Sequence, residues 1–238
     1  MASYRNRITA TPVALSEYQK ETNMENIEIE IPMQVLDAAT FCAAKNDVRF
    51  YLNGVAIDKG HVVATDGCRA FGFYLNGVAI DKGHVVATDG CRAFACELEN
   101  VGKDLPQIII PTESVKFFLK KIPVKNRKGH CRLIFNAKTR EGELRFDALI
   151  AKESFVGHDG RYPDWQRIFP RGVESEYKGY YPTFNWSYMA DFQKMHKALG
   201  GNGLQVLLYP TGANSAAKVV FDSTPYPKAK GVIMPLRA

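Results

Sequence analysis

The stretch IEIEIPMQVLDAATFCAAKN, from Ile27 to Asn46, joins two patterns that each predict a regular element. Isoleucine and glutamate alternate up to Pro32, which is typical of a strand with one buried face and one exposed face. Proline is favoured in the first turn of a helix, so a helix is predicted to begin at Pro32 and to continue through about Asn46. A strand that leads directly into a helix is therefore the first part of the fold.

The same order of elements recurs twice more without sequence identity. The apolar segment QIIIP from Gln107 predicts a strand before a helix over Thr112–Ile122, and YYPTFNW from Tyr180 predicts one before a helix over Ser187–Leu199. After each helix, short alternating segments separated by tight turns predict strands: RFYLNGVAID and HVVATDGCRAFACELE; CRLIFNA, GELRFDALI and the segment through Phe155; GLQVLLYP, AAKVVFDS and KGVIMPL. The prediction is an α+β fold of about three βαβββ units, with helices on one face of antiparallel sheets.

These units suggest an arrangement into domains. Residues 26–170 hold two units and are predicted to form a complete domain, whereas residues 171–238 hold one unit and are predicted to form a half-domain. Residues 1–25 are interpreted as a flexible N-terminal tail, with an organellar presequence or a start site misplaced upstream of Met24 as alternatives.

A tandem duplication lies inside the first unit. FYLNGVAIDKGHVVATDGCRAF occurs at Phe50–Phe71 and again at Phe73–Phe94, so residues 50–72 and 73–95 differ only at their last position. Either copy could supply both strands of the hairpin, or the first copy could supply one strand and the second copy the other. We favour the hybrid because it keeps both flanking connections, and each doubling of a loop's length costs only about 0.6 kcal/mol in closure entropy.

The composition is that of a globular protein. The 238 residues are 46% hydrophobic, carry a net charge of +6 and include five cysteines, which we interpret as reduced, cytosolic and mostly buried. No apolar run is long enough to predict a membrane span. Histidines, cysteines and carboxylates show neither metal-ligand nor catalytic spacing, so we predict no enzyme activity, metal or cofactor.

Two of the predicted helices carry lysines on the side opposite their apolar stripes. For a single helix this arrangement usually marks a solvated face. Its repetition predicts that neighbouring units align their lysines on a common surface that faces a polyanion. The predicted DNA-facing residues are Lys116, Lys120, Lys121, Lys194 and Lys197.

Four separated motifs resemble the bacterial β sliding clamp, the processivity subunit of the replicative DNA polymerase. They are DVRFYLN from Asp47, VATDGCR from Val86, DGRYPDWQRIFP from Asp159 and VIMPLR from Val232, and they occur in the order of the clamp motifs. FNWSYMADFQKMHKAL is also similar to the last helix of that family. The resemblance covers roughly residues 26 to 238 and corresponds to the middle domain plus the C-terminal half of the last domain.

The resemblance implies a cytoplasmic DNA replication factor whose units surround duplex DNA without reading its sequence. Such a factor tethers DNA polymerase or repair proteins through a hydrophobic pocket for short peptides, is placed on DNA by a clamp loader and forms a homo-oligomer. The alternative is an adaptor or decoy that binds clamp-binding peptides without encircling DNA. A clamp chain has three domains of two units, whereas this chain shows three units, and a lone half-domain is expected to pair with another half.

Matching positions imply the residues of the peptide pocket. With the hybrid hairpin they are Leu52, Thr88, Gly90, Arg92, Pro163, Arg167, Ile168, Val232, Met234, Leu236 and Arg237. The other copy of the duplication offers Leu75, Thr65, Gly67 and Arg69 as equivalents. One departure is that Cys91, or Cys68 in the first copy, stands where clamps usually have histidine after Asp-Gly.

Overall fold

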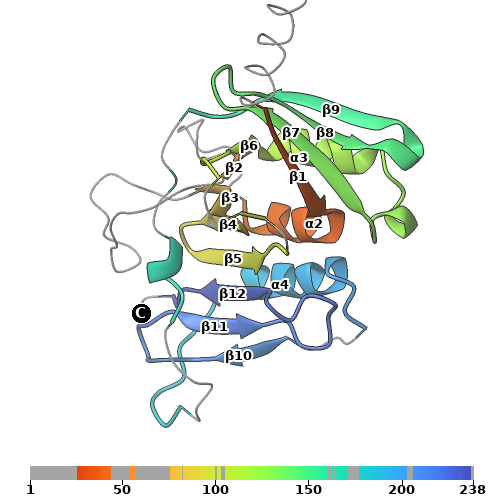
Figure 1. The fold of residues 1–238 in the computed structure, drawn as a ribbon. Coiled ribbons are helices and arrows are strands. Elements are labelled where there is room, and N and C mark those ends of the chain that lie inside the picture. The colour runs from red at the N-terminus through yellow and green to blue at the C-terminus, as the bar shows by residue number, and fades with distance from the viewer. Residues whose placement is uncertain are drawn as a thin grey trace, which may run out of the picture.

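The computed structural model describes residues 26–43, 54–56, 76–81, 83–99, 101–102, 105–159, 162, 165–170, 177–202 and 206–236. Figure 1 shows the elements in these ranges. The first unit contains β1 (Asn26–Pro32), α2 (Met33–Cys42), β2 (Gly54–Ala56), β3 (Asn76–Asp81), β4 (His84–Asp89) and β5 (Arg92–Glu97). The second contains β6 (Ile110–Pro111), α3 (Thr112–Lys120), β7 (His130–Asn136), β8 (Glu141–Phe146) and β9 (Ala151–Val156). The third contains α4 (Trp186–Ala198), β10 (Leu207–Tyr209), β11 (Ala217–Val220) and β12 (Lys230–Ile233).

The first two units exchange their opening strands. A four-stranded sheet has the order β1-β7-β8-β9, so β1 of the first unit lies against β7 of the second. An eight-stranded sheet has the order β10-β11-β12-β5-β4-β3-β2-β6, so β6 of the second unit joins the strands of the first. Each unit thus completes the sheet of the other, which makes residues of both units necessary for one folded body.

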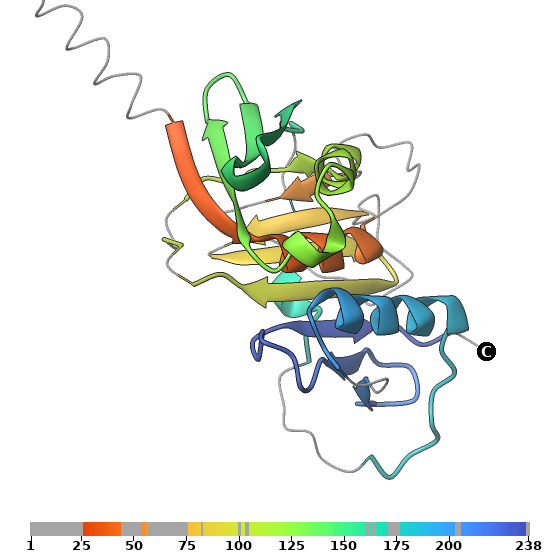
Figure 2. The ribbon, with the colours of Figure 1, turned by 90° about the vertical axis from the view of Figure 1, so that its right-hand side faces the viewer.

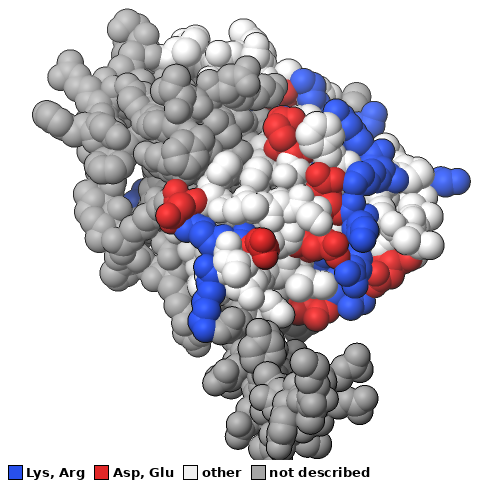
Figure 3. Space-filling model, turned by 90° about the horizontal axis from the view of Figure 1, so that it is seen from above, with Lys and Arg blue, Asp and Glu red and all other residues white. Residues whose placement is uncertain are grey.

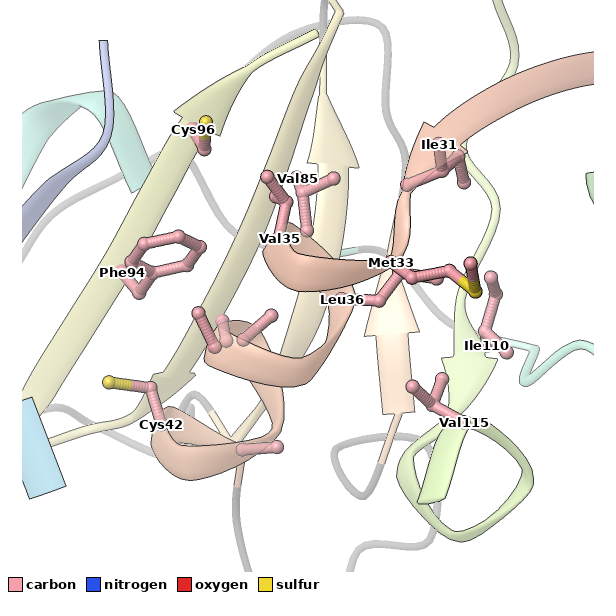
Figure 4. Close-up of a cluster of buried hydrophobic side chains, with 14 of the residues drawn as sticks. Ile31, Met33, Val35, Leu36, Cys42, Val85, Phe94, Cys96, Ile110 and Val115 are labelled. Atoms are coloured by element: carbon pink, nitrogen blue, oxygen red, sulfur yellow. The ribbon is translucent and has the colours of Figure 1, made fainter. Parts of the chain in front are cut away.

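A shared core lies between the helices and the two sheets. The alternation in β1 points Ile29 and Ile31 inward and leaves Glu28 and Glu30 toward solvent. In α2, seven of ten residues are buried, and Figure 4 shows Val35 and Leu36 pointing toward the side chains of β4, β5 and β6. Figure 2 shows α2 and α4 on the same side of the eight-stranded sheet. The predicted fold class is therefore confirmed, with α2 ending four residues before the expected Asn46.

The hairpin of the first unit comes from the second copy of the duplication. β4 pairs antiparallel with β3, from Asn76↔Asp89 to Asp81↔His84, and both strands belong to residues 73–95. The hybrid that we favoured is therefore wrong, because the adjacent strands of one copy close the shorter loop. The first copy contributes β2, which lies between β3 and β6 and runs parallel to β3. The eight-stranded sheet is thus not entirely antiparallel.

The third unit continues the sheet of the first. β12 pairs antiparallel with β5, with Val232 opposite Ala93, so the sheet crosses the boundary expected after residue 170. A Cβ atom at Gly231 would lie 2.8 Å from the ring of Phe192, which explains why glycine occupies the point where α4 crosses β12. The strand predicted over Tyr180–Trp186 is wrong, because residues 180–185 have no sheet partner among the described residues and Trp186 already begins α4.

Candidate functional site

Tyr162 and residues 165–170 cover the face of the eight-stranded sheet that points away from the helices (Figure 1). The rings of Trp165 and Phe169 meet edge to face at 5.6 Å, and the Lys230 ammonium lies 5.0 Å from the Phe169 centroid. Burial, together with nearby Lys218, lowers the pKa of Lys230. Because β4, β5 and β12 alternate, their outward residues meet this segment and are buried by it: Val86, Ala93, Ala95 and Val232.

The turn between β4 and β5 is held by side chains of those strands. One carboxylate oxygen of Asp89 accepts hydrogen bonds from the N–H groups of Cys91 (3.1 Å) and Arg92 (3.0 Å). The Thr88 hydroxyl donates to the Arg92 carbonyl at 2.7 Å and accepts from the Gly90 N–H at 3.2 Å. Gly90 has φ of 82°, a conformation that glycine adopts without a Cβ penalty. Four hydrogen bonds made by its own side chains therefore hold the turn.

The end of β12 lies against this turn. The Met234 N–H donates to the Cys91 carbonyl at 2.8 Å, and the Leu236 N–H donates to the Thr183 carbonyl at 2.7 Å. Met234 is half-buried, Leu236 is 50% exposed, and Ile168 packs at the margin of the cluster that contains Val232. These contacts place accessible apolar side chains from two distant parts of the chain beside one turn.

Arg92 occupies the junction of the first and third units. Its side chain is only 5% exposed, and its nitrogens each have a partner at 2.8 Å: Nε contacts Asp89, Nη1 contacts Asp191 and Nη2 contacts the Phe41 carbonyl. The guanidinium also lies 4.4 Å from the centroid of the Tyr188 ring. Because these partners belong to β4, α4 and α2, Arg92 fixes the third unit onto the first.

The charges around Arg92 shift the pKa values of its neighbours. Burial alone would raise the pKa of Asp191, but hydrogen bonds from Lys194 and Arg92 outweigh it and lower the pKa below its ordinary value. Burial and the Asp89 carboxylate raise the pKa of Tyr188 to about 12, so its hydroxyl stays protonated at neutral pH. The junction therefore combines an ionised carboxylate with a neutral ring beside the guanidinium.

Sequence reasoning missed Asp191 and Tyr188 as functional partners. A signal for them exists, because Tyr188, Asp191 and Met195 recur at i, i+3 and i+7 on α4 and so share one face. The Sγ atom of Cys42 lies 3.7 Å from the sulfur of Met195, which shows that this face meets α2. A carboxylate within a buried helix stripe indicates a buried cation opposite it.

The described residues of the predicted pocket divide into two groups. Thr88, Arg92 and Val232 are buried, with exposures of 2%, 5% and 2%, and they support the surface from beneath. The accessible or partly accessible members are Gly90, Arg167, Ile168, Met234 and Leu236. Leu52, Pro163 and Arg237 lie outside the described residues, as do Leu75, Thr65, Gly67 and Arg69.

The predicted DNA-facing lysines have carboxylate neighbours. Lys116 contacts Glu113 at 2.6 Å, Lys121 contacts Glu153 at 2.6 Å and Lys194 contacts Asp191 at 2.7 Å. The ammonium of Lys120 lies 5.1 Å from the centroid of the Phe117 ring, and Lys197 is exposed. α2, between α3 and α4, contributes no lysine and instead holds Asp37, which contacts Arg127 at 3.0 Å.

Basic side chains also gather away from the helices. On the four-stranded sheet, Arg132 lies opposite Arg145, which lies opposite Lys152. Figure 3, seen from above, shows lysines and arginines in a band with acidic side chains beside it. Arg132 contacts Glu28 at 3.2 Å and Arg145 contacts Glu143 at 2.6 Å. The basic charge is therefore distributed over two faces, with carboxylates among it on both.

The part of the chain that the structure describes contains no group of three or more His, Cys, Asp or Glu side chains arranged to hold a metal ion. None of its helices is both long and apolar enough to cross a membrane. None of its four cysteines forms a disulfide; Cys91 is exposed and the other three are buried.

Comparisons of the sequence found no matching family model and no matching curated protein. The fold, in contrast, matches solved structures of bacterial sliding clamps, the DNA polymerase III β subunits. A Pseudomonas aeruginosa clamp bound to griselimycin gives a TM-score of 0.62 at 18% identity, over 89% of this chain and 66% of the other. The C. crescentus clamp gives 0.61 at 17% identity, over 90% and 66%, and the Thermotoga maritima subunit gives 0.59 at 13%, over 89% and 66%.

The resemblance seen in the sequence is thus confirmed at the level of the fold. This chain spans just under two thirds of the length of the clamp chains it matches.

Proposed function

We propose that this chain is a clamp-like accessory factor of DNA replication, without catalytic activity, that contacts duplex DNA independently of sequence and tethers polymerase or repair proteins. The surface formed by the 88–92 turn, residues 165–170 and the end of β12 carries the proposal, because three of the sequence motifs meet there in a clamp fold. We further propose that it works in the cytoplasm as a homo-oligomer, and that a loader places it on DNA.

The proposed partner at this surface is a short linear peptide with leucine or aromatic side chains. Ile168, Met234 and Leu236 offer apolar contacts, and flexible methionine adapts to different side chains. Arg167 is exposed and suited to orient an acidic or carbonyl group of the peptide. The hydrogen bonds of the 88–92 turn keep this surface ordered, which reduces the entropy lost on binding.

The proposed DNA contact uses the helix face. Lys120 and Lys197, with the paired Lys116, Lys121 and Lys194, would hold phosphates loosely, and contacts with phosphates carry no sequence information. A protein that reads no base edges can move along a duplex, since each step exchanges equivalent phosphate contacts.

Titration of a fluorescent clamp-binding peptide tests the proposed pocket. We expect Met234→Ala and Arg167→Ala each to weaken binding, about tenfold if the side chain contributes about 1.4 kcal/mol. Arg132→Ala is a control, because Arg132 is a half-exposed arginine on the four-stranded sheet, away from the proposed pocket. Unchanged affinity in Met234→Ala and Arg167→Ala would refute the pocket.

A second candidate function is an adaptor or decoy that binds the same peptides without encircling DNA. One observation favours it: three of the five predicted lysines already contact carboxylates. Both functions predict the peptide result, whereas only the clamp-like factor predicts a bound state that depends on the topology of the DNA.

A further inference from the structure

The first two units show how a unit of this fold finds its partner. The strand that precedes α2, β1, pairs antiparallel with β7, the first strand after α3. Reciprocally, the strand that precedes α3, β6, pairs antiparallel with β2, the first described strand after α2. In each unit, the strand before the helix therefore pairs with the first described strand after the helix of the other unit.

Neither half of this exchange is made by the third unit within the described chain. The segment before α4, residues 180–185, forms no strand there, although its Thr183 carbonyl accepts a hydrogen bond from the Leu236 N–H at 2.7 Å. The first strand after α4, β10, stands at one end of the eight-stranded sheet, with β11 as its only neighbour in that sheet. The third unit thus presents a donor segment and an acceptor edge together, as the first two units would if they were separated.

The helices also differ between the units: α2 is covered on both sides, whereas α4 is not. α2 lies between α3 and α4 and buries seven of its ten residues, whereas α4 buries only Phe192, Met195 and His196 of its thirteen. Because Tyr188, Asp191 and Met195 face the junction with α2, the stripe at Trp186, Met189 and Gln193 points away from α2. On the corresponding side, α2 contacts its other neighbouring helix, α3.

Large apolar side chains are exposed on the donor segment, on the helix stripe and on the acceptor edge. Tyr180, Tyr181 and Trp186 are 91%, 73% and 85% exposed, and Leu207 at the start of β10 is 37% exposed. Aromatic residues at such exposure are typical of interaction surfaces and are costly to leave in water. Tyr180 and Tyr181 lie on the donor segment, Trp186 on the helix stripe and Leu207 on the acceptor edge. One contact could therefore cover all three features.

We propose that a second copy of this chain completes the third unit about a two-fold axis. Residues 180–185 of each copy pair with the outer edge of β10 in the other, and the two α4 helices meet through Trp186, Met189 and Gln193. The occupant is a second copy because the third unit carries both the donor and the acceptor, so one surface is complementary to itself. The inference rests on the fold and does not depend on the proposed function.

A specific interface buries about 1,600 Å² in total, to which two strand pairings, a helix contact and the exposed aromatics of each copy would contribute. Completion of both sheets would also leave β10 without an open edge, which protects it from nonspecific strand addition.

Light scattering after size-exclusion chromatography, at micromolar concentrations of the full chain, tests the contact. The chain has a mass of 26.6 kDa, and we expect twice this mass for the wild type and the monomer mass for Trp186→Asp. Two matched controls keep the wild-type mass. Phe117→Asp changes a 51% exposed aromatic on α3, and Val156→Asp changes a 64% exposed residue on β9, the end strand of the other sheet.

Circular dichroism tests whether Trp186→Asp is folded, as its exposure and the favourable position of aspartate at a helix start predict. Hydrogen exchange adds an independent measurement: we expect the amides of residues 206–209 to gain protection as the wild-type concentration rises, and those of residues 151–156 not to. A wild-type monomer at every concentration overturns the proposal. So does an oligomer that Trp186→Asp leaves intact, or one that Val156→Asp dissociates.

Discussion

At Arg92, three guanidinium nitrogens contact three different parts of the chain: Asp89 on β4, Asp191 on α4 and the carbonyl of Phe41 on α2. Removal of one partner of a buried ion pair leaves the others desolvated without compensation, which costs roughly 3 to 5 kcal/mol. Arg92 therefore does more for the attachment of α4 than for direct contact with a peptide.

The duplication supplies a matched control for this role. Arg69 has the same sequence around it as Arg92, but the hairpin at the junction belongs to the second copy. We expect Arg92→Ala to lower the free energy of unfolding by roughly 3 to 5 kcal/mol, and Arg69→Ala to change it by no more than about 0.5 kcal/mol. Urea denaturation measures both, and equal losses would show that the two copies share the position.

Asp191 gives the junction a dependence on pH. Its pKa in the folded chain lies below 3.8 because Lys194 and Arg92 stabilise the carboxylate. The unfolded chain therefore binds more protons in this range, so the contribution of Asp191 is complete above 3.8 and is lost as the pH falls through the lower, folded value.

Comparison with Asp191→Asn measures this contribution. We expect the difference in unfolding free energy between wild type and Asp191→Asn to be constant from neutral pH down to about the ordinary carboxyl pKa and to shrink below it. Denaturation at a series of pH values provides the data. A difference that grows with acidity would mean that the pKa of Asp191 is raised.

At the scale of elements, β2 shows what the duplication adds to the sheet. It inserts between β3 and β6, whose positions would otherwise adjoin, and neither β4 nor β5 pairs with it. The second copy alone supplies β3, β4 and the 88–92 turn.

Deletion of residues 50–72 therefore leaves a complete unit. We expect the shortened chain to fold, with β6 beside β3, and to bind the clamp-binding peptide with unchanged affinity. Circular dichroism and the peptide titration test this, with the wild type as reference. Loss of the cooperative unfolding transition would show that β2 is needed to join β3 to β6.

The sequence predicts most of the elements because their periodicity is strong and local. Alternation in IEIEIP and the stripe of Val115, Phe118 and Leu119 correspond to β1 and α3. Residues 180–186 were predicted wrongly because alternating aromatic and polar residues indicate a strand, whereas a strand also needs a neighbour, which the described chain lacks there.

The candidate site was predictable in its motifs but not in its geometry. Sequence reasoning named Arg92 and Met234. It did not predict that Arg92 is buried, because Arg92 contacts Asp191, 99 residues away, and local sequence patterns do not indicate contacts at that separation. The choice between the two copies was equally hidden, because their sequences are identical until the last residue of each.

At the scale of the whole molecule, three units, two sheets and a continuous helix layer give the fold of a clamp over part of a clamp's length. The open edge at β10 and the β12 part of the proposed peptide-binding surface both belong to the third unit, since both follow α4. The proposed dimer and the proposed binding of peptides are nevertheless separable, because Trp186 and Met234 belong to different contacts.

The most direct measurement of the central proposal is retention of the protein on circular DNA. The protein, incubated with a nicked plasmid, is passed over a large-pore column before and after the plasmid is cut once. An encircling factor is expected to elute with the circle and to be released from the linear form, because a ring slides off free ends. Equal retention on both forms would contradict encirclement and favour the adaptor.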